Sequence, residues 1–328
     1  MKTIDEIYNE LQNDNELRNS WKEAKDQNQK VKKITIIVFL VIDLLILLFF
    51  KSIINSIVVI SYIMFIVLIM NVILGTIIFV ITRLSEKQTE FTNQYKNKVI
   101  KRIIDNFYSN AEYFPDKPMP KYIYEKPQYE YYNCYNSHDY FEAMLDNKYS
   151  IQMAEVLAEE EKENIEEYIN RYAHEIQGET VEKKKERITK FNGLFAKVDL
   201  EKSINCELRI MQDGKLALEN DRLNMDSSEF EKLFDVKSSN KIIAMQILTS
   251  DIMEELIEFK NKTKMQYDIC IINSELYLRF HFGTLNVDGD AMKNEVLDKD
   301  VLSKYFYMIN FSYNLSKKII ETIENVEI

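Results

Sequence analysis

The sequence predicts an α+β protein: an N-terminal transmembrane helical hairpin with amphipathic stalk helices, followed by a cytoplasmic domain of mainly antiparallel sheet packed by helices. Three observations support this prediction. An apolar run from Ile34 to Thr82 contains only two charged residues, Asp43 and Lys51. The segments on either side of it carry apolar residues at helical spacing. After Pro115, strand-like and helical stretches alternate, and neighbouring strands can pair antiparallel.

Residues 1–33 are predicted to form an amphipathic cytoplasmic helix. Thr3 and Glu6 have the spacing of a capping box, in which each side chain bonds the backbone N–H of the other residue. The apolar residues that follow lie at roughly helical spacing: Ile4, Ile7, Tyr8, Leu11, Leu17 and Trp21. We therefore expect a helix with one apolar face ahead of the first span.

Residues 34–82 are predicted to cross a membrane twice. A span needs about 20 apolar residues, with about 17 as the lower limit. Ile34–Phe50 just reaches this limit. Ser52–Thr82 is longer than one span needs, so the second segment must tilt or lie partly in the interface. Basic residues favour the cytoplasmic side, and they flank both outer ends: Lys30, Lys32, Lys33, Arg83, Lys87, Lys96, Lys98, Lys101 and Arg102. We expect a cell-membrane protein with two spans and both termini cytoplasmic. A cleaved signal peptide would have a shorter apolar core and a small-residue cleavage site.

One acidic residue, Asp43, lies in the middle of the first predicted span. Ionisable groups inside a bilayer are costly, so they mark functional sites or contacts between helices. A single acid in a two-helix hairpin cannot line a transport path. We therefore expect Asp43 to bond Asn71, Ser61 or Tyr62 and to hold the hairpin or a homo-oligomer together.

Residues 83–114 are predicted to form a juxtamembrane stalk helix, because apolar residues recur every four positions: Phe91, Tyr95, Val99, Ile103 and Phe107. All four prolines fall between Pro115 and Pro127, which places a domain boundary there and a cytoplasmic α+β domain at 115–328. Tyrosines are dense from Tyr122 to Tyr140. Alternating tyrosines favour an edge strand, and an adhesive binding surface is the alternative.

Periodicity and turn residues predict the elements of the α+β domain. The expected strands are Lys148–Leu157, Phe191–Leu200, Cys206–Met211 and Lys215–Glu219. The expected helices are Glu159–Arg187, Ser228–Leu233, Ile252–Lys262 and Asp300–Asn325. Between the last two helices we expect a hairpin of Gln266–Ile272 and Glu275–Phe282, with Asn273-Ser274 as its turn. In its second arm, alternate residues are apolar, which predicts one buried face.

The charge and cysteine content exclude several classes of partner and site. The formal net charge is −11, and basic residues gather beside the predicted spans, so we expect no nucleic acid at the distal surface. The lysines near the spans are placed to contact anionic lipid headgroups. The three cysteines, Cys134, Cys206 and Cys270, form no Cys-x-x-Cys pair and are expected to be reduced.

The sequence contains no catalytic or cofactor-binding signature, and we expect neither catalytic residues nor a cofactor. Cys134 and His138, beside Asp139, form the one nucleophile-and-base combination, and they lack an oxyanion-stabilising element. A weak metal candidate follows the hairpin at calcium-loop spacing: Asn286, Asp288, Asp290 and Glu295. The first ligand position of that loop is Thr284 instead of aspartate, so an acidic loop is the simpler interpretation.

Several short motifs occur in a characteristic order after residue 190. They are Phe191-Asn-Gly-Leu-Phe195, Phe230-Glu-Lys-Leu-Phe234 and Ile247-Leu-Thr249. In this order and spacing the chain resembles a bacterial family catalogued as a domain of unknown function and usually anchored by a transmembrane hairpin. The resemblance implies a membrane-anchored α+β module and supplies no catalytic residues. The phenylalanines suit a core, and Gly193 suits a close backbone approach or a bulge.

These observations together favour a membrane-anchored cytoplasmic protein-interaction module. Its expected partners are the lipid bilayer, further copies of the chain in a homo-oligomer, and an unknown protein. The alternative is a membrane-tethered enzyme, or a sensor of a small ligand or metal, with a pocket in the α+β domain. A deep polar pocket would favour this alternative, whereas an exposed groove or sheet edge would favour the interaction module.

Overall fold

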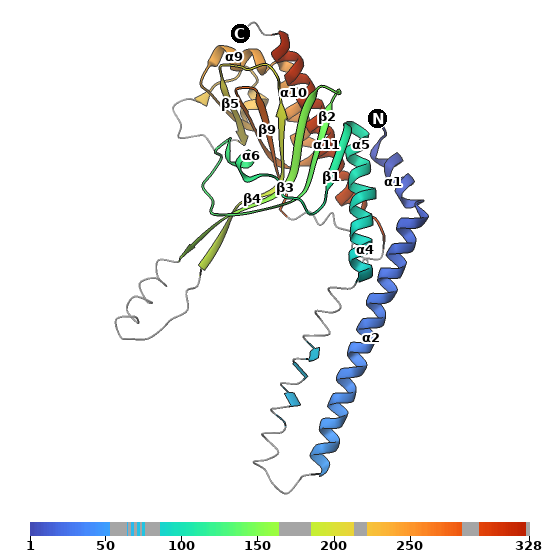
Figure 1. Cartoon of the computed structure of the whole chain (residues 1–328). Coiled ribbons are helices and arrows are strands. Elements are labelled where there is room, and N and C mark those ends of the chain that lie inside the picture. The colour runs from blue at the N-terminus through green and yellow to red at the C-terminus, as the bar shows by residue number, and fades with distance from the viewer. Residues whose placement is uncertain are drawn as a thin grey trace, which may run out of the picture. The chain divides into compact units, whose positions relative to one another are not determined.

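A computed structural model describes residues 1–52, 64, 67–68, 71–72, 74–75, 86–163, 185–212, 222–283 and 295–325 (Figure 1). The chain divides into two compact units. The helical unit comprises residues 3–100 and 287–299, and the sheet unit comprises residues 1–2, 101–286 and 300–328.

The helical unit contains α1 (Ile4–Gln12), α2 (Asn15–Ser52), α4 (Glu86–Tyr95) and the π-helical turn η1 (Lys96–Ile100). The predicted capping box is confirmed: Thr3 Oγ1 accepts the Glu6 N–H at 3.3 Å, and the Glu6 carboxylate accepts the Thr3 N–H at 2.7 Å. The first predicted helix is broken, because α1 ends at Gln12 and the Asp14 carboxylate caps the start of α2 by accepting the Leu17 N–H at 2.9 Å.

A salt bridge joins the start of α2 to the π-helical turn. Lys98 Nζ lies 3.1 Å from Asp14 Oδ2 and 2.7 Å from Glu16 Oε2. The predicted stalk helix at residues 83–114 is confirmed in part: α4, η1 and α5 (Lys101–Phe107) are helical, whereas Ser109–Phe114 form a strand of the sheet unit. Val99, a predicted apolar residue of the stalk helix, is fully buried.

The predicted membrane hairpin is not tested by the structure. Among the residues that can be described, no helix has both the length and the apolar character needed to cross a bilayer. Residues 53–63 and 76–85, which hold most of the second predicted span, lie outside the described residues. Asp43 is exposed on α2, whereas Asn71 is buried and its Oδ1 has no hydrogen-bond partner within the described ranges.

The described part of the sheet unit is built on a nine-stranded sheet (Figure 1). Every pair of neighbouring strands is antiparallel, in the order β1-β2-β3-β4-β9-β8-β5-β7-β6. The strands are β1 (Ser109–Phe114), β2 (Cys134–Leu145), β3 (Tyr149–Glu163), β4 (Lys185–Asp199), β5 (Glu207–Gln212), β6 (Arg222–Leu223), β7 (Phe234–Ser238), β8 (Gln266–Ile272) and β9 (Glu275–His281). The predicted α+β class with a mainly antiparallel sheet is therefore confirmed.

Helices α10 (Ser250–Thr263) and α11 (Lys299–Asn325) cover one face of the sheet. Phe259 of α10 stacks on Phe311 of α11, with ring centroids 3.9 Å apart, and both rings contact Phe280 of β9. Two shorter helices, α8 (Ser228–Glu231) and α9 (Lys241–Ile247), precede α10. The predicted core residues Phe191, Leu194, Phe195, Phe230 and Phe234 are all buried, as expected from their size and apolar character.

The opposite face of the sheet is also covered, which the alternation in β9 does not predict. There α6 (Lys121–Glu125) packs Ile123 and Tyr124 against Phe195 and Tyr277. Tyr277 is as buried as Leu278, its neighbour on the other face. The prediction of a single buried face is therefore wrong, because the chain between β1 and β2 lies over the second face.

The predicted β8–β9 hairpin is confirmed. Ile272 pairs with Glu275 around Asn273-Ser274, and Asn273 has the left-handed φ of 55° that asparagine tolerates. Position 193 of β4 has room only for glycine. A Cβ at this position would lie 1.8 Å from the carbonyl oxygen of Phe280, which confirms the predicted close backbone approach.

Two predicted segments differ from the structure. The charged helix at Glu159–Arg187 is wrong at both ends, because its first residues extend β3 and its last residues begin β4; residues 164–184 lie outside the described ranges. Salt bridges join these strands, including Lys190–Glu160 at 2.8 Å and Arg187–Glu161 at 3.0 Å. Interleaved opposite charges suit an exposed strand pair as well as a solvated helix face.

The tyrosine-rich stretch is also not the edge strand that its alternation predicts. Tyr122 and Tyr124 lie on α6, and only the part from Cys134 on forms a strand, β2, which lies between β1 and β3. The edge strands of the described sheet are β1, which precedes Pro115, and β6. The turn and strand predicted between residues 213 and 219 lie outside the described residues.

Candidate functional site

The tyrosine segment, residues 121–132, lies on the sheet face opposite α10 and α11. Hydrogen bonds to the sheet hold the chain on either side of it. Before it, the Met119 N–H donates to Ser137 Oγ at 3.1 Å. After it, the Asn133 side chain accepts the Glu161 N–H at 2.7 Å and donates to the Glu161 carbonyl at 2.8 Å. Strands β2 and β3 therefore fix where the segment begins and ends.

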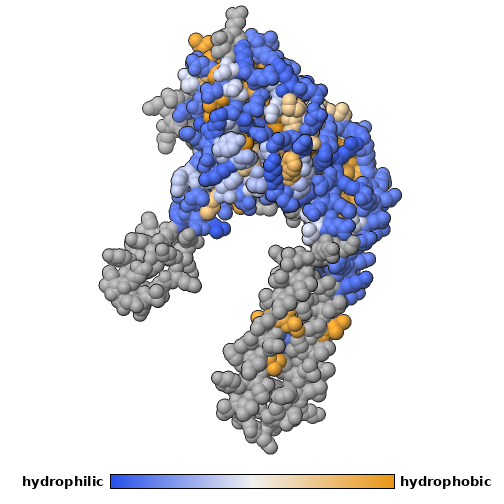
Figure 2. Space-filling model, viewed as in Figure 1, coloured by the Kyte–Doolittle hydropathy of each residue, from blue (hydrophilic) through white to orange (hydrophobic). Residues whose placement is uncertain are grey.

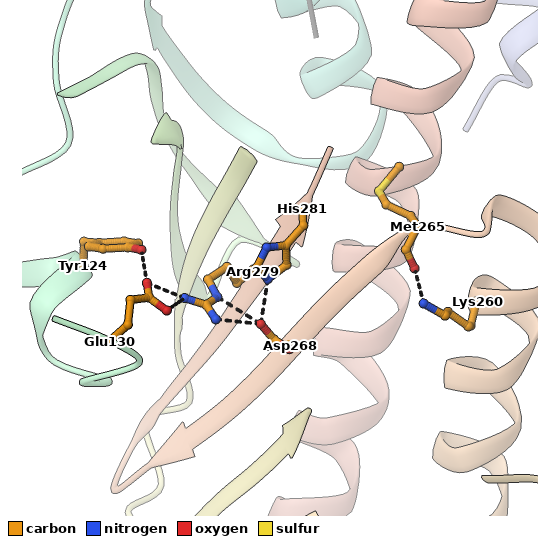
Figure 3. A network of polar contacts seen from close by, with 7 residues as sticks. All are labelled: Tyr124, Glu130, Lys260, Met265, Asp268, Arg279 and His281. Atoms are coloured by element: carbon orange, nitrogen blue, oxygen red, sulfur yellow. Dashed lines mark hydrogen bonds and ion pairs between the residues drawn. The ribbon is translucent and has the colours of Figure 1, made fainter. Parts of the chain in front are cut away.

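A buried ionic network lies beneath the tyrosine segment (Figure 3). Arg279 of β9 donates from Nε and Nη2 to Asp268 Oδ2, at 3.1 and 2.7 Å, and from Nη1 to Glu130 Oε1 at 2.6 Å. His281 Nε2 lies 2.7 Å from the same Asp268 oxygen. The Tyr124 hydroxyl donates to Glu130 Oε1 at 2.8 Å. One guanidinium therefore joins the hairpin to the segment above it.

Burial makes these charges strongly interacting. The Asp268 and Arg279 side chains are 0% and 3% exposed, and that of Glu130 is 21% exposed. Burial by itself lowers the pKa of Arg279, but Asp268 and Glu130 outweigh it and raise this pKa. Burial, followed by the Glu130 charge, raises the pKa of Tyr124, so its hydroxyl stays protonated as a donor. The network holds the segment in place and offers no free base or nucleophile.

The ring of Tyr129 covers the network from the segment side. The Arg279 guanidinium carbon lies 4.0 Å from the ring centroid, and that of Arg209 lies 5.8 Å from it. The Tyr129 hydroxyl is buried and has no hydrogen-bond partner within the described part of the chain. A cation against an aromatic face in a dry site contributes about 2 kcal/mol or more, so Tyr129 adds to the attachment of the segment.

Beside the network, the tyrosine segment forms an open depression of about 490 Å³. Its lining consists of four tyrosines, two carboxylates and one amide: Tyr124, Glu125, Gln128, Tyr129, Glu130, Tyr131 and Tyr132. Tyr131 at its rim is 70% exposed. The lining has no basic side chain. The described surface seen in Figure 2 is mostly hydrophilic. The depression is therefore acidic and aromatic.

The chain itself places a cation at the edge of this depression. Lys121 Nζ lies 3.0 Å from Glu125 Oε1 and 5.1 Å from the centroid of the Tyr132 ring. A tyrosine face and a carboxylate thus receive one ammonium group together. This is the arrangement expected of a site for lysine or arginine side chains.

The structure separates Cys134 from His138, the predicted nucleophile and base. Cys134 and His138 lie four residues apart on β2, facing Glu159 and Glu155 of β3, so they are about 13 Å apart along the strand. The nucleophile-and-base interpretation of these two residues is therefore wrong. His138 instead lies beside Asp139, with Nδ1 2.6 Å from Oδ2.

The other predicted site residues are only partly visible. Asn286, Asp288 and Asp290 of the weak metal candidate lie outside the described residues, and Glu295 is exposed. Cys270 is fully buried, and burial raises the pKa of its thiol to about 12. It is therefore an inert core thiol.

Half of the ionic network was accessible to sequence reasoning. A two-residue turn at Asn273-Ser274 sets the register of the hairpin, and this register places Asp268 directly opposite Arg279. An acid in an apolar strand facing an arginine is the signal of a buried pair. Glu130 carries no such signal, because it is 149 positions away from Arg279 in the sequence.

Comparison with known families finds that residues 189–321 match one described as "Protein of unknown function (DUF3137)". The expected similarity to a family of unknown function is confirmed for this part of the chain. The match contains Asp268, Arg279 and His281, whereas Glu130 and the tyrosine segment precede it. Comparison with curated proteins and with solved structures finds no similar chain.

Proposed function

We propose that this chain is a membrane-anchored protein-interaction module whose tyrosine segment binds a basic side chain of a partner protein. The observation that carries the proposal is the acidic, aromatic depression formed by the segment. Its volume falls within the range of about 300–1,000 Å³ usual for binding sites. Tyr131 at the rim is exposed to solvent, so the depression is open on that side. An open depression suits a side chain that projects from a partner protein better than it suits an enclosed small molecule.

Charge complementarity supports a basic partner. The carboxylates at and beneath the depression, Glu125, Glu130 and Asp268, outnumber Lys121 and Arg279, the lysine and arginine paired with them. The tyrosine rings supply faces on which a cation is stabilised by about 0.5–2 kcal/mol each. Lys121 already occupies such a position at the edge. The net charge of −11 favours encounter with a basic protein surface.

Rigidity of the segment supports binding over catalysis. The contacts of Arg279 with Glu130 and Tyr129 hold the floor of the depression in one geometry. A rigid site loses less conformational entropy when it binds. The buried network thus fixes the position of the residues that form the binding surface.

The anchor part of the proposal rests on sequence length and charge. Residues 34–82 are long enough for two spans, and lysines and arginines flank both outer ends, which supports cytoplasmic termini. We propose that Asp43 stabilises a homo-oligomer within the bilayer, and Asp43→Leu should reduce the oligomer size in detergent.

The topology is tested in intact cells, where a membrane-impermeant maleimide should leave Cys134 unlabelled. Labelling of Cys134 would place the sheet unit outside the cell.

The binding site is tested with the full-length chain in lipid nanodiscs and two fluorescent peptides. One peptide alternates arginine with glycine, and the other has norleucine in place of arginine. The arginine peptide should bind more tightly than the norleucine peptide. Tyr131→Ala should lower the affinity for the arginine peptide about two- to fivefold, which is the contribution of an exposed cation–π contact. Glu125→Gln should weaken it as well.

Two variants serve as matched controls. Tyr122 is as exposed as Tyr131, at 70%, but does not line the depression, so Tyr122→Ala should leave affinity unchanged. Glu112→Gln removes an exposed carboxylate from β1 and should also have no effect. Equal affinity for the two peptides, or equal losses in Tyr122→Ala and Tyr131→Ala, would show that the depression is not the binding site.

A further inference from the structure

A β-bulge brings three potential metal ligands together on the β2–β3 ladder. His138 pairs with Glu155, and the register then shifts between His138 and Phe141. Asp139 lies within this shift and has a left-handed φ of 55°. A bulge sets two consecutive residues against one on the partner strand, so both His138 and Asp139 reach Glu155. The ligand atoms of the three side chains all lie within 4.8 Å of one another.

The cluster combines buried carboxylates with an imidazole at the surface. Asp139 is 1% exposed and Glu155 is 7% exposed, whereas the His138 side chain is 48% exposed. Two carboxylates placed close together in a dry environment repel each other, and a divalent cation between them removes this repulsion. The exposed imidazole leaves a path by which an ion enters.

Neighbouring groups orient the Asp139 carboxylate. The Tyr113 hydroxyl donates to Asp139 Oδ1, while Oδ2 faces the His138 ring at 2.6 Å. The Asp139 N–H donates to the Pro115 carbonyl at 2.9 Å and holds the bulge. Metal-ligating carboxylates are commonly fixed by hydrogen bonds of this kind.

An independent observation comes from α11, where Tyr305 is 1% exposed. Its hydroxyl has no hydrogen-bond partner among the residues that the structure describes. Burial raises the pKa of Tyr305 well above its usual value, and the charges of Glu155 and Asp139 raise it further. Among the described residues, the Tyr305 hydroxyl is therefore a buried, unpartnered donor within electrostatic reach of both carboxylates.

We propose that His138, Asp139 and Glu155 bind a divalent transition-metal ion, with Zn²⁺ as the expected occupant. The cluster offers three protein ligands, the number found in zinc sites that keep one open position, and both imidazole and carboxylate groups bind Zn²⁺. The imidazole favours Zn²⁺ over Mg²⁺ and Ca²⁺, which prefer oxygen ligands. This site uses none of the residues that line the tyrosine depression, so it is independent of the proposed function.

The test is a zinc titration of the purified full-length chain after chelator treatment, with a competing fluorescent indicator. One Zn²⁺ should bind per chain and should raise the melting temperature. Tyr113→Phe should weaken binding about tenfold, the usual effect of losing a group that orients a ligand. Asp139→Asn and Glu155→Gln should weaken it more. Glu142→Gln, on the same strand but outside the cluster, should bind as the unaltered chain does.

His138→Gln keeps the test valid if the buried variants fail to fold, because His138 is half exposed and its loss leaves the core intact. This variant should keep the melting temperature of the metal-free protein and lose most of the zinc affinity. Unchanged affinity in His138→Gln would overturn the proposal. So would tighter binding of Mg²⁺ than of Zn²⁺, or the absence of saturable binding at one ion per chain.

Discussion

Replacing Gly193 with alanine should destabilise the sheet unit by about 3–5 kcal/mol. The new Cβ would lie 1.8 Å from the carbonyl oxygen of Phe280 and 2.9 Å from its carbonyl carbon. Carbon–oxygen contacts between strands are ordinarily about 3.3–3.6 Å, so β4 and β9 must separate locally by roughly 1.5 Å. A shift of this size breaks about two ladder hydrogen bonds, and at about 1–3 kcal/mol for each broken bond the cost is about 2–6 kcal/mol, which brackets the expected value.

Gly283→Ala is the matched control for this prediction. Gly283 has a φ of 69° but no atom within 4 Å of its added Cβ, so only the left-handed conformation costs energy, about 1–2 kcal/mol. Urea unfolding of the full-length chain by circular dichroism gives the free energies, and hydrogen exchange by mass spectrometry localises the change. A smaller loss in Gly193→Ala than in Gly283→Ala, or unaltered exchange in β4 and β9, would refute the steric argument.

Three further predictions concern buried charges and thiols. Arg279→Met leaves two carboxylates without their cation and should cost about 3–5 kcal/mol in urea unfolding; a loss below about 1 kcal/mol would show that the network contributes little. Burial raises the pKa of Glu275, but Lys126 and other neighbours outweigh it and lower this pKa. The stability that the ionised Glu275 contributes is therefore present above its pKa in the unfolded chain, about 4.3, and is lost as the pH falls through its pKa in the folded chain. Glu275→Gln should lower the melting temperature at pH 7 more than at pH 3. A difference that does not depend on pH would argue against a charge effect. At pH 8, maleimide should modify the half-buried Cys134 long before the buried Cys270, whose pKa is raised to about 12; peptide mass spectrometry would detect equal rates if this reasoning fails.

The ionic network links the stability of the sheet unit to its proposed binding surface. Glu130 both lines the depression and bonds Arg279. A substitution at Arg279 should therefore alter peptide binding through the position of the tyrosine segment, even though Arg279 does not line the depression. Tyr131→Ala changes the lining and leaves the network intact. The two variants thus separate attachment of the segment from contact with the partner.

The charge pattern of residues 159–187 does not distinguish a helix from an antiparallel strand pair. Alternating acids and lysines stabilise an exposed helix face and an exposed antiparallel strand pair by similar small amounts. The observed pairing of Glu163 with Lys185 extends β3 and β4 beyond the rest of the sheet. Only the pairing partner decides between the two structures, and composition does not contain that information.

Sequence alone determined the features that depend on neighbours in the chain. The Thr3 capping box, the Asn273-Ser274 turn and the helix that ends the sheet unit all follow from spacing within a few residues. Gly193 is of the same kind, because a glycine within a strand pattern indicates a close approach of backbone. Short-range sterics and hydrogen bonding restrict these positions wherever the segment lies in the fold.

Tertiary structure decided which distant side chains meet. It brought Glu130 to Arg279 and set the bulge that turns Asp139 toward Glu155. It also laid the tyrosine segment over a second sheet face that alternation alone assigns to solvent. These contacts depend on which elements pack together, and packing is chosen by the total apolar surface and charge buried across the whole domain. Periodicity reports that a face is apolar or charged, but it does not report what will cover it.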